Sequence, residues 1–130
     1  METERANLRP QKAILVVEDD EEVAHLLTHW LQQDGFAVYS ADNGRSGLNL
    51  LSHKSIDLVV TDYAMPGMDG AGLIRSMWGQ LDLGFVPVVV ISSHREEAVR
   101  EQCRWMSGYL QKPFKMSQLL DLVSELIGQP

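Results

Sequence analysis

Four short, mainly apolar runs of this 130-residue chain end in a side chain that can bind a cation or a phosphoryl group. Glu18-Asp19-Asp20 supplies carboxylates, Asp62 a further carboxylate, Ser92 a hydroxyl and Lys112 an ammonium. Carboxylates from two segments form the hard-oxygen site that suits Mg²⁺. A carboxylate beside such a metal can attack a phosphoryl group, and an ammonium neutralises the charge that develops. If the fold brings these groups together, they support phosphoryl-transfer chemistry.

The elements that must position these groups are strands, and they alternate with helices. Strands are expected over 13–17, 36–41, 56–62, 88–91 and 108–111. Apolar side chains at helical spacing predict helices over 21–33, 46–53, 70–81, 96–104 and 116–127. This alternation predicts a single doubly wound α/β fold, a five-stranded parallel sheet with five helices, in which the three most apolar strands are central. Because the carboxyl ends of parallel strands share one edge, the four reactive groups are expected to converge there.

The helical spacing also assigns side chains to the core. On the first helix, which Asp20 is expected to cap, the core side chains are Val23, Leu26, Leu27, Trp30 and Leu31. On the last helix they are Met116, Leu119, Leu120, Val123, Leu126 and Ile127. His25 and His29 then face solvent, which argues against a zinc site.

Composition narrows the class of protein. The net charge of −7, with no basic cluster, argues against a nucleic-acid partner. The single cysteine, Cys103, is expected to be a small apolar filler and cannot form an internal disulfide, which fits a reducing cytoplasm. No apolar stretch is long enough to span a bilayer, so no membrane partner is expected. Residues 1–11 are polar and are expected to form a flexible N-terminal tail.

Four motifs, in this order and spacing, resemble the receiver domain of two-component response regulators. They are ILVVEDD (14–20), DLVVTDYAMPGMDG (57–70), PVVVISS (87–93) and GYLQKPF (108–114). The resemblance implies a flavodoxin-like sheet with strand order 2-1-3-4-5. It assigns residues 12–128 to the receiver domain and leaves residues 129–130 as the C-terminal end or the start of a linker.

The resemblance also implies roles for individual residues. Asp62 would accept a phosphoryl group from a phosphohistidine. Glu18 and Asp19 would form the acidic pair that holds Mg²⁺ together with Asp62, with Asp19 as a direct ligand and the backbone carbonyl of Ala64 as a further one. Lys112 would pair with a phosphoryl oxygen.

A second group of residues would change conformation on phosphorylation or tune how long the phosphoryl group survives. Ser92 stands where the family has a hydroxyl that turns toward the phosphoryl group, and Tyr109 matches the aromatic switch position. Ser93 and His94 are candidate modulators of the lifetime of the phosphoryl group. The Lys112–Pro113 bond matches a cis bond of the family.

The leading hypothesis is therefore a signalling switch that catalyses its own phosphorylation and dephosphorylation with Mg²⁺ and is not a turnover enzyme. Expected partners are a sensor histidine kinase or histidine phosphotransfer protein, and a downstream protein effector or attached output domain; a phosphorylation-dependent dimer is a further expectation. One alternative is a Mg²⁺-dependent phosphatase, but that class carries an Asp two residues after the nucleophile, where this chain has Ala64. The other is an interaction module that is never phosphorylated, against which the intact site argues.

The chain departs from the family pattern between residues 94 and 107. This segment is short, and Arg104-Trp105-Met106-Ser107 replaces a Gly-rich lead into the last strand. A short or irregular helix is expected there, which puts the usual output surface in doubt. Trp105 is expected to fill core space or, as the alternative, to contact a partner.

Overall fold

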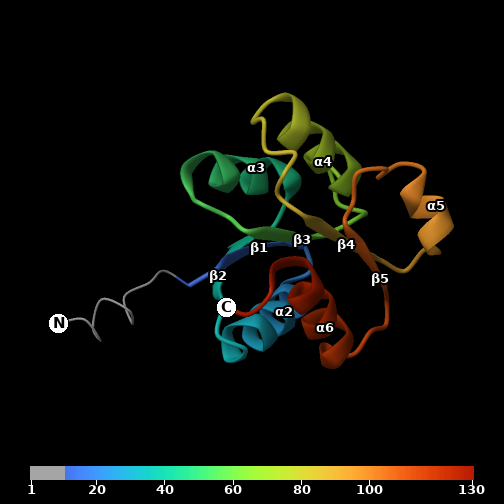
Figure 1. The fold of residues 1–130 in the computed structure, drawn as a ribbon. Coiled ribbons are helices and arrows are strands. Elements are labelled where there is room, and N and C mark those ends of the chain that lie inside the picture. Colours follow the sequence, from blue (N-terminus) through green and yellow to red (C-terminus); the bar gives the residue numbers. More distant parts are fainter. Residues whose placement is uncertain (1–10) are drawn as a thin grey trace.

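Five parallel strands form one sheet, in the order β2-β1-β3-β4-β5, in the computed structural model, which describes residues 11–130 (Figure 1). The strands are β1 (Ala13–Val17), β2 (Ala37–Ala41), β3 (Leu58–Asp62), β4 (Val88–Ser92) and β5 (Gly108–Gln111). The predicted fold class and strand order are confirmed, and the three most apolar strands are the central ones, with every residue buried. The predicted N-terminal tail lies outside the described residues, apart from Gln11.

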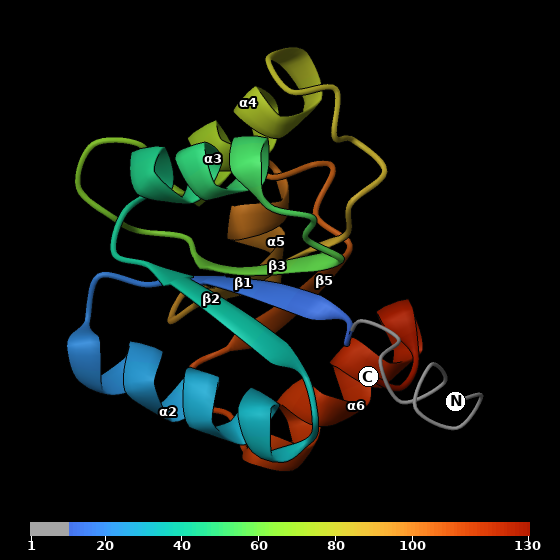
Figure 2. The same ribbon diagram turned by 90° about the vertical axis from the view of Figure 1, so that its left-hand side faces the viewer.

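The described residues form five helices, which cover both faces of the sheet (Figure 2). They are α2 (Glu21–Gln33), α3 (Gly44–His53), α4 (Gly70–Gly79), α5 (Glu96–Arg100) and α6 (Met116–Ile127). Helices α3, α4 and α5 lie on one face, and α2 and α6 lie on the other. Side chains of Asp20, Asn43 and Asp69 accept hydrogen bonds from amides of the first turns of α2, α3 and α4, which explains where these helices begin.

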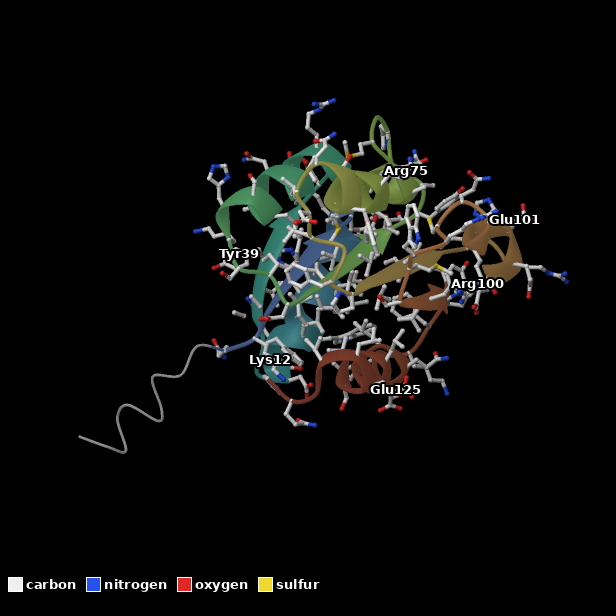
Figure 3. The ribbon with its side chains drawn as sticks, turned by 45° about the horizontal axis from the view of Figure 1, so that its top comes forward. Lys12, Tyr39, Arg75, Arg100, Glu101 and Glu125 are labelled. Carbon is white, nitrogen blue, oxygen red and sulfur yellow. The ribbon has the colours of Figure 1, made fainter. Side chains whose placement is uncertain are left out.

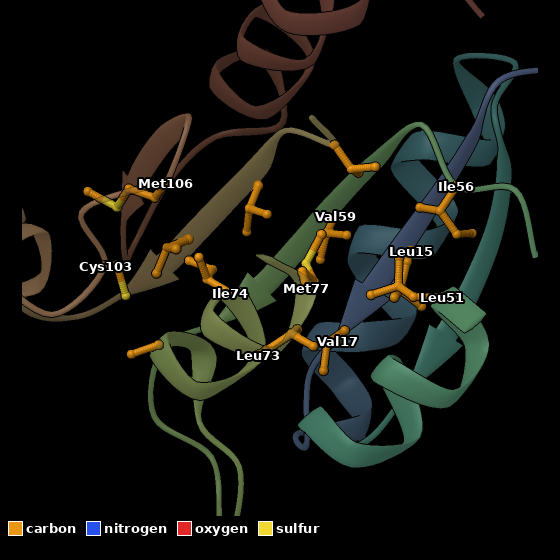
Figure 4. Close-up of a cluster of buried hydrophobic side chains, with 14 of the residues drawn as sticks. Leu15, Val17, Leu51, Ile56, Val59, Leu73, Ile74, Met77, Cys103 and Met106 are labelled. Carbon is orange, nitrogen blue, oxygen red and sulfur yellow. The ribbon is translucent and has the colours of Figure 1, made fainter. Parts of the chain in front are cut away.

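The core has two parts, one on each face of the sheet, because successive side chains of a strand point to opposite faces. Leu15 and Val17 of β1 belong to the cluster under α3, α4 and α5, where they lie with Val59, Leu73 and Met77 (Figure 4). Ile14 and Val16 of the same strand belong to the cluster over α2 and α6. Helices on both faces therefore hold the strand ends in fixed positions.

Two of the core assignments predicted for the first and last helices are wrong. Leu26 is 47% exposed, and Met116 is exposed as well. Helix α2 fully buries only Leu27 and Leu31, so its buried stripe is narrower than the predicted one. Met116 is the first residue of α6, one turn before the buried Leu119.

Helix α5 is short, as expected, and ends at Arg100 rather than Arg104. The chain then turns inward, so that Cys103 and Met106 are buried. Helix α4 likewise ends two residues before the predicted Leu81. Across the described part of the chain, no helix combines the length and the apolar character needed to cross a membrane.

Candidate functional site

The carboxyl ends of the strands bring three carboxylates and one ammonium together. We name Glu18, Asp19, Asp62 and Lys112 the acidic edge. Glu18 and Asp19 follow β1, Asp62 is the last residue of β3, and Lys112 follows β5. One oxygen from each of the three carboxylates lies within 4.8 Å of the others. The expected convergence of these side chains is therefore present in the fold.

The loop after β3 holds Asp62 in place by a close backbone approach. The Gly70 amide donates a hydrogen bond to the carbonyl of Tyr63 at 2.9 Å. A Cβ atom at Gly70 would lie 2.8 Å from the carbonyl oxygen of Asp62, so no larger residue fits there without a shift of the backbone. Met65 is buried and anchors the loop to the core. Ala64, the expected carbonyl ligand, lies in this loop two residues beyond Asp62.

Lys112 is the cation of the acidic edge. Its Nζ lies 3.4 Å from Asp62 Oδ2 and 3.6 Å from Glu18 Oε1. The Lys112 amide donates to the carbonyl of Ser92 at 2.8 Å, which ties the end of β5 to that of β4. The Lys112–Pro113 bond is cis, as the resemblance implies. One ammonium therefore faces two buried carboxylates, and the acidic edge keeps a net negative charge.

The surroundings of Glu18 shift the pKa of its carboxyl. Its side chain is buried, and burial raises the pKa of its carboxyl from 4.5 to about 7. A hydrogen bond from the Asp20 amide opposes this increase, Asp62 adds to it, and the positive charge of Lys112 lowers the pKa again. Among residues 11–130, Glu18 Oε1 is a buried oxygen without a hydrogen-bond partner. A cluster of carboxylate oxygens, one of them buried without a hydrogen bond, fits a hard divalent cation such as Mg²⁺.

Ser92, His94 and Tyr109 form a connected group beside the acidic edge. Ser92 Oγ lies 3.0 Å from His94 Nδ1 and accepts a hydrogen bond from the His94 amide at 3.0 Å. The Tyr109 hydroxyl donates to the His94 carbonyl and lies 3.5 Å from the Ser92 carbonyl. Within the described part of the chain, no hydrogen bond joins Ser92 to Asp62. Ser93 is exposed next to this group.

Sequence reasoning missed the position of His94 between Ser92 and Tyr109. The contact from Ser92 to His94 spans two residues, so it could have been inferred from their spacing. The contact from Tyr109 to His94 spans 15 residues and joins two segments, so no local signal could have revealed it.

Other sequence-based predictions also have clear outcomes. His25 and His29 face solvent, as expected. Cys103 is packed in the core, and burial raises the pKa of its thiol to about 11, so it is an apolar filler rather than a nucleophile. The prediction that Trp105 fills core space is wrong, because this side chain is 52% exposed and Cys103 and Met106 occupy the core instead.

Comparisons with known proteins agree with this geometry. The profile of the response regulator receiver domain family matches residues 14–124. The chain is 30% identical over 124 residues to chemotaxis protein CheY-3 of Vibrio cholerae, an alignment that covers 93% of this chain and 95% of CheY-3. It is 29% identical over 118 residues to the probable transcriptional regulator ycf29 of Pyropia yezoensis, which covers 89% of this chain and 53% of that protein. The chain thus spans about half the length of some curated relatives that it matches.

A solved structure resembles both the fold and the sequence. It is the receiver domain of the sensor histidine kinase PA1611 from Pseudomonas aeruginosa PAO1, with a magnesium ion coordinated in its active site cleft. The TM-score is 0.83 at 26% identity, and the superposition covers 92% of this chain and 99% of that one.

Proposed function

Because the chain belongs to the response regulator receiver domain family, we propose that it is a phosphorylation switch in which Asp62 accepts a phosphoryl group from a phosphohistidine. Receiver domains are signalling switches rather than turnover enzymes. The observation that carries the proposal is the environment of Asp62. The residue is only 7% exposed and lies at the end of β3. Its carboxylate is within 4 Å of Lys112 and beside the carboxylates of Glu18 and Asp19.

The proposed reaction moves one phosphoryl group between two side chains. A carboxylate oxygen of Asp62 attacks phosphorus and forms an O–P bond, while the N–P bond of the phosphohistidine breaks and its electron pair returns to the imidazole. Lys112 is close enough to Asp62 to neutralise charge on a phosphoryl oxygen. Glu18, Asp19, Asp62 and the carbonyl of Ala64 would hold Mg²⁺. When bound, Mg²⁺ neutralises negative charge on the phosphoryl oxygens.

The proposed switch follows from the contacts of Ser92. In this structure its hydroxyl is engaged with His94, and Tyr109 is bonded to the His94 carbonyl. When the Ser92 hydroxyl turns toward a phosphoryl oxygen, the His94 ring loses its partner, and the contact with Tyr109 can change with it. The change would reach β5 and the neighbouring surface. Ser93 and His94, next to this path, would then modulate how long the phosphoryl group survives.

The proposed partners follow from the family. Receiver domains interact with histidine kinases and with output domains or effectors. For this chain we propose a sensor histidine kinase or histidine phosphotransfer protein as the phosphoryl donor, and a protein effector or attached output domain as the receiver of the signal, with residues 12–128 as the receiver domain. A phosphorylation-dependent dimer is part of the same proposal.

The test is phosphoryl uptake by the full chain. The protein is incubated with acetyl phosphate and Mg²⁺, and its intact mass is measured. We expect wild type to gain one phosphoryl group and Asp62→Asn to gain none, because an amide oxygen is a poor nucleophile. Asp121→Asn, which changes an exposed Asp of α6, should gain the group like wild type. A phosphoryl group that survives Asp62→Asn would sink the proposal.

A further inference from the structure

Two tryptophans are stacked on each other at the surface of the molecule. Trp78 comes from α4 and Trp105 from the segment between α5 and β5, and their ring centroids lie 5.3 Å apart at an interplanar angle of 30°. Trp78 is 46% exposed and Trp105 is 52% exposed. Phe85, which is 80% exposed, lies in the loop after α4. We name Trp78, Phe85 and Trp105 the aromatic face.

Local packing holds the aromatic face in position. A Cβ atom at Gly84 would lie 2.6 Å from atoms of the Trp78 ring, so the backbone next to Phe85 packs directly on this indole. Trp105 lies between residues that point inward, since Cys103 and Met106 are buried. Both indoles are therefore preorganised, and a ligand would lose little side-chain entropy by ordering them.

The groove beside Trp105 carries unpaired positive charge. Its lining includes Ile74, Arg75, Glu101 and Arg104. Figure 3 shows Arg75 and Glu101 on the same side of the molecule. Among residues 11–130, neither Arg75 nor Arg104 forms an ion pair with a carboxylate, whereas Arg100 is paired with Glu96. The side chains that line this groove thus carry two guanidinium groups and one carboxylate, in a chain of net charge −7.

We propose that the aromatic face and this groove bind a short segment of a partner protein that presents carboxylates beside an aromatic or aliphatic side chain. Tryptophan and arginine are the residue types that contribute most to protein interfaces. A guanidinium binds a carboxylate through two parallel hydrogen bonds. The inference does not rest on phosphorylation of Asp62, because the aromatic face is built by α4 and two loops and not by the residues of the acidic edge.

Charge disfavours two other occupants of this surface. A second copy of the chain would bring together two molecules of net charge −7, and a two-fold contact through this face would oppose arginines to arginines. A nucleic acid presents a long row of phosphates, most of which would face the acidic remainder of the surface rather than the two guanidinium groups. An acidic, apolar peptide segment complements both the two guanidinium groups and the indoles.

The test begins with a phage-displayed library of random peptides, selected on the immobilised full chain without phosphoryl donor. We expect the enriched peptides to place Asp or Glu beside an aromatic or aliphatic residue. A synthetic copy of an enriched peptide, titrated into ¹⁵N-labelled protein, should shift the indole N–H signals of Trp78 and Trp105. The indole of Trp30, which packs edge to face on Phe114, should stay unchanged as an internal control.

Charge reversal and truncation then define the surface. Arg104→Glu and Trp105→Ala should each weaken peptide binding by about tenfold or more. Arg45→Glu, which reverses an exposed arginine of α3, should leave the affinity unchanged, as should Asp62→Asn. Thermal melts show that the variants are folded.

Several outcomes would overturn the proposal. They are the absence of enriched peptides, enriched peptides without acidic residues, or a peptide that shifts neither indole signal. Concentration-dependent dimers of wild type that Trp105→Ala abolishes would assign the face to a second copy of the chain instead.

Discussion

The acidic edge and the aromatic face both depart from the usual distribution of side chains. Ionisable groups are usually exposed and large apolar groups are usually buried. At the acidic edge, Glu18 and Asp62 are ionisable groups buried at strand ends. At the aromatic face, Trp78 and Trp105 are large apolar groups left in solvent. Burying charge costs electrostatic free energy, which a proton, a lysine or a metal ion can offset. Exposing indoles costs hydration free energy, which only an apolar partner can offset. The two regions should therefore respond to different changes of solution and sequence.

The largest expected difference is in the pH dependence of stability. Folding raises the pKa of Glu18 from 4.5 to about 7, so between these values the folded protein keeps a proton that the unfolded chain has released. The resulting stabilisation is fully present below pH 4.5 and is lost as the pH rises through about 7. At about 1.4 kcal/mol per pKa unit, the loss is up to about 3 kcal/mol.

Glu18→Gln tests this value, because the amide stays neutral at every pH. Without Mg²⁺ the variant should match wild type near pH 4.5 and exceed its free energy of unfolding at pH 8 by up to about 3 kcal/mol in urea titrations. Glu125→Gln, an exposed position on α6, should not change the pH dependence relative to wild type. An unchanged pH dependence in Glu18→Gln would mean that Glu18 is not the buried acid responsible.

The second-largest expected difference between the two regions is in how Mg²⁺ changes the free energy of unfolding. At ten times its dissociation constant, Mg²⁺ should raise the free energy of unfolding by about 1.4 kcal/mol, measured as an increase in melting temperature. Asp19→Ala should abolish this increase, because it removes a proposed ligand. Trp105→Ala, on the aromatic face, should retain it in full. If Asp19→Ala keeps the increase, the metal assignment is wrong.

The smallest expected effect is the loss of stability on removing an exposed indole. Trp105→Ala should lower the free energy of unfolding by about 1 kcal/mol, the magnitude of one aromatic stacking contact. The loss should be the same at pH 5 and pH 8 in urea titrations, since no ionisable group is involved. A loss of about 3–5 kcal/mol would instead identify Trp105 as a core residue.

Much of the fold could be predicted because its signals are local. Residues 13–17 and 108–111 form strands with the predicted bounds, and α2 begins after the predicted cap, Asp20. An apolar run bounded by polar residues needs no distant contact to be recognised. Leu26 was misassigned because the spacing of apolar residues along a helix does not show how wide its buried stripe is.

Much of the candidate site was also predictable, for a topological reason. Once the strands are known to be parallel, their carboxyl ends must share one edge, which places Glu18, Asp62 and Lys112 together. The contact of His94 with Tyr109 was not predictable, since it joins two segments that are 15 residues apart and depends on how they pack. The increase in the pKa of Glu18 was not predictable for the same reason, because it depends on how completely the surrounding chain buries it.

The order of apolar runs and strand-end acids along the chain was thus sufficient to predict the sheet and its reactive edge, and the resemblance of four motifs indicated the family. Whether Trp105 lies in the core or in solvent was settled only by the packing of the whole molecule. Its neighbours Cys103 and Met106 are equally apolar, and the space beneath β5 is filled by those two side chains. Local pattern specifies which residues can be buried, but the limited volume of the core determines which of them are.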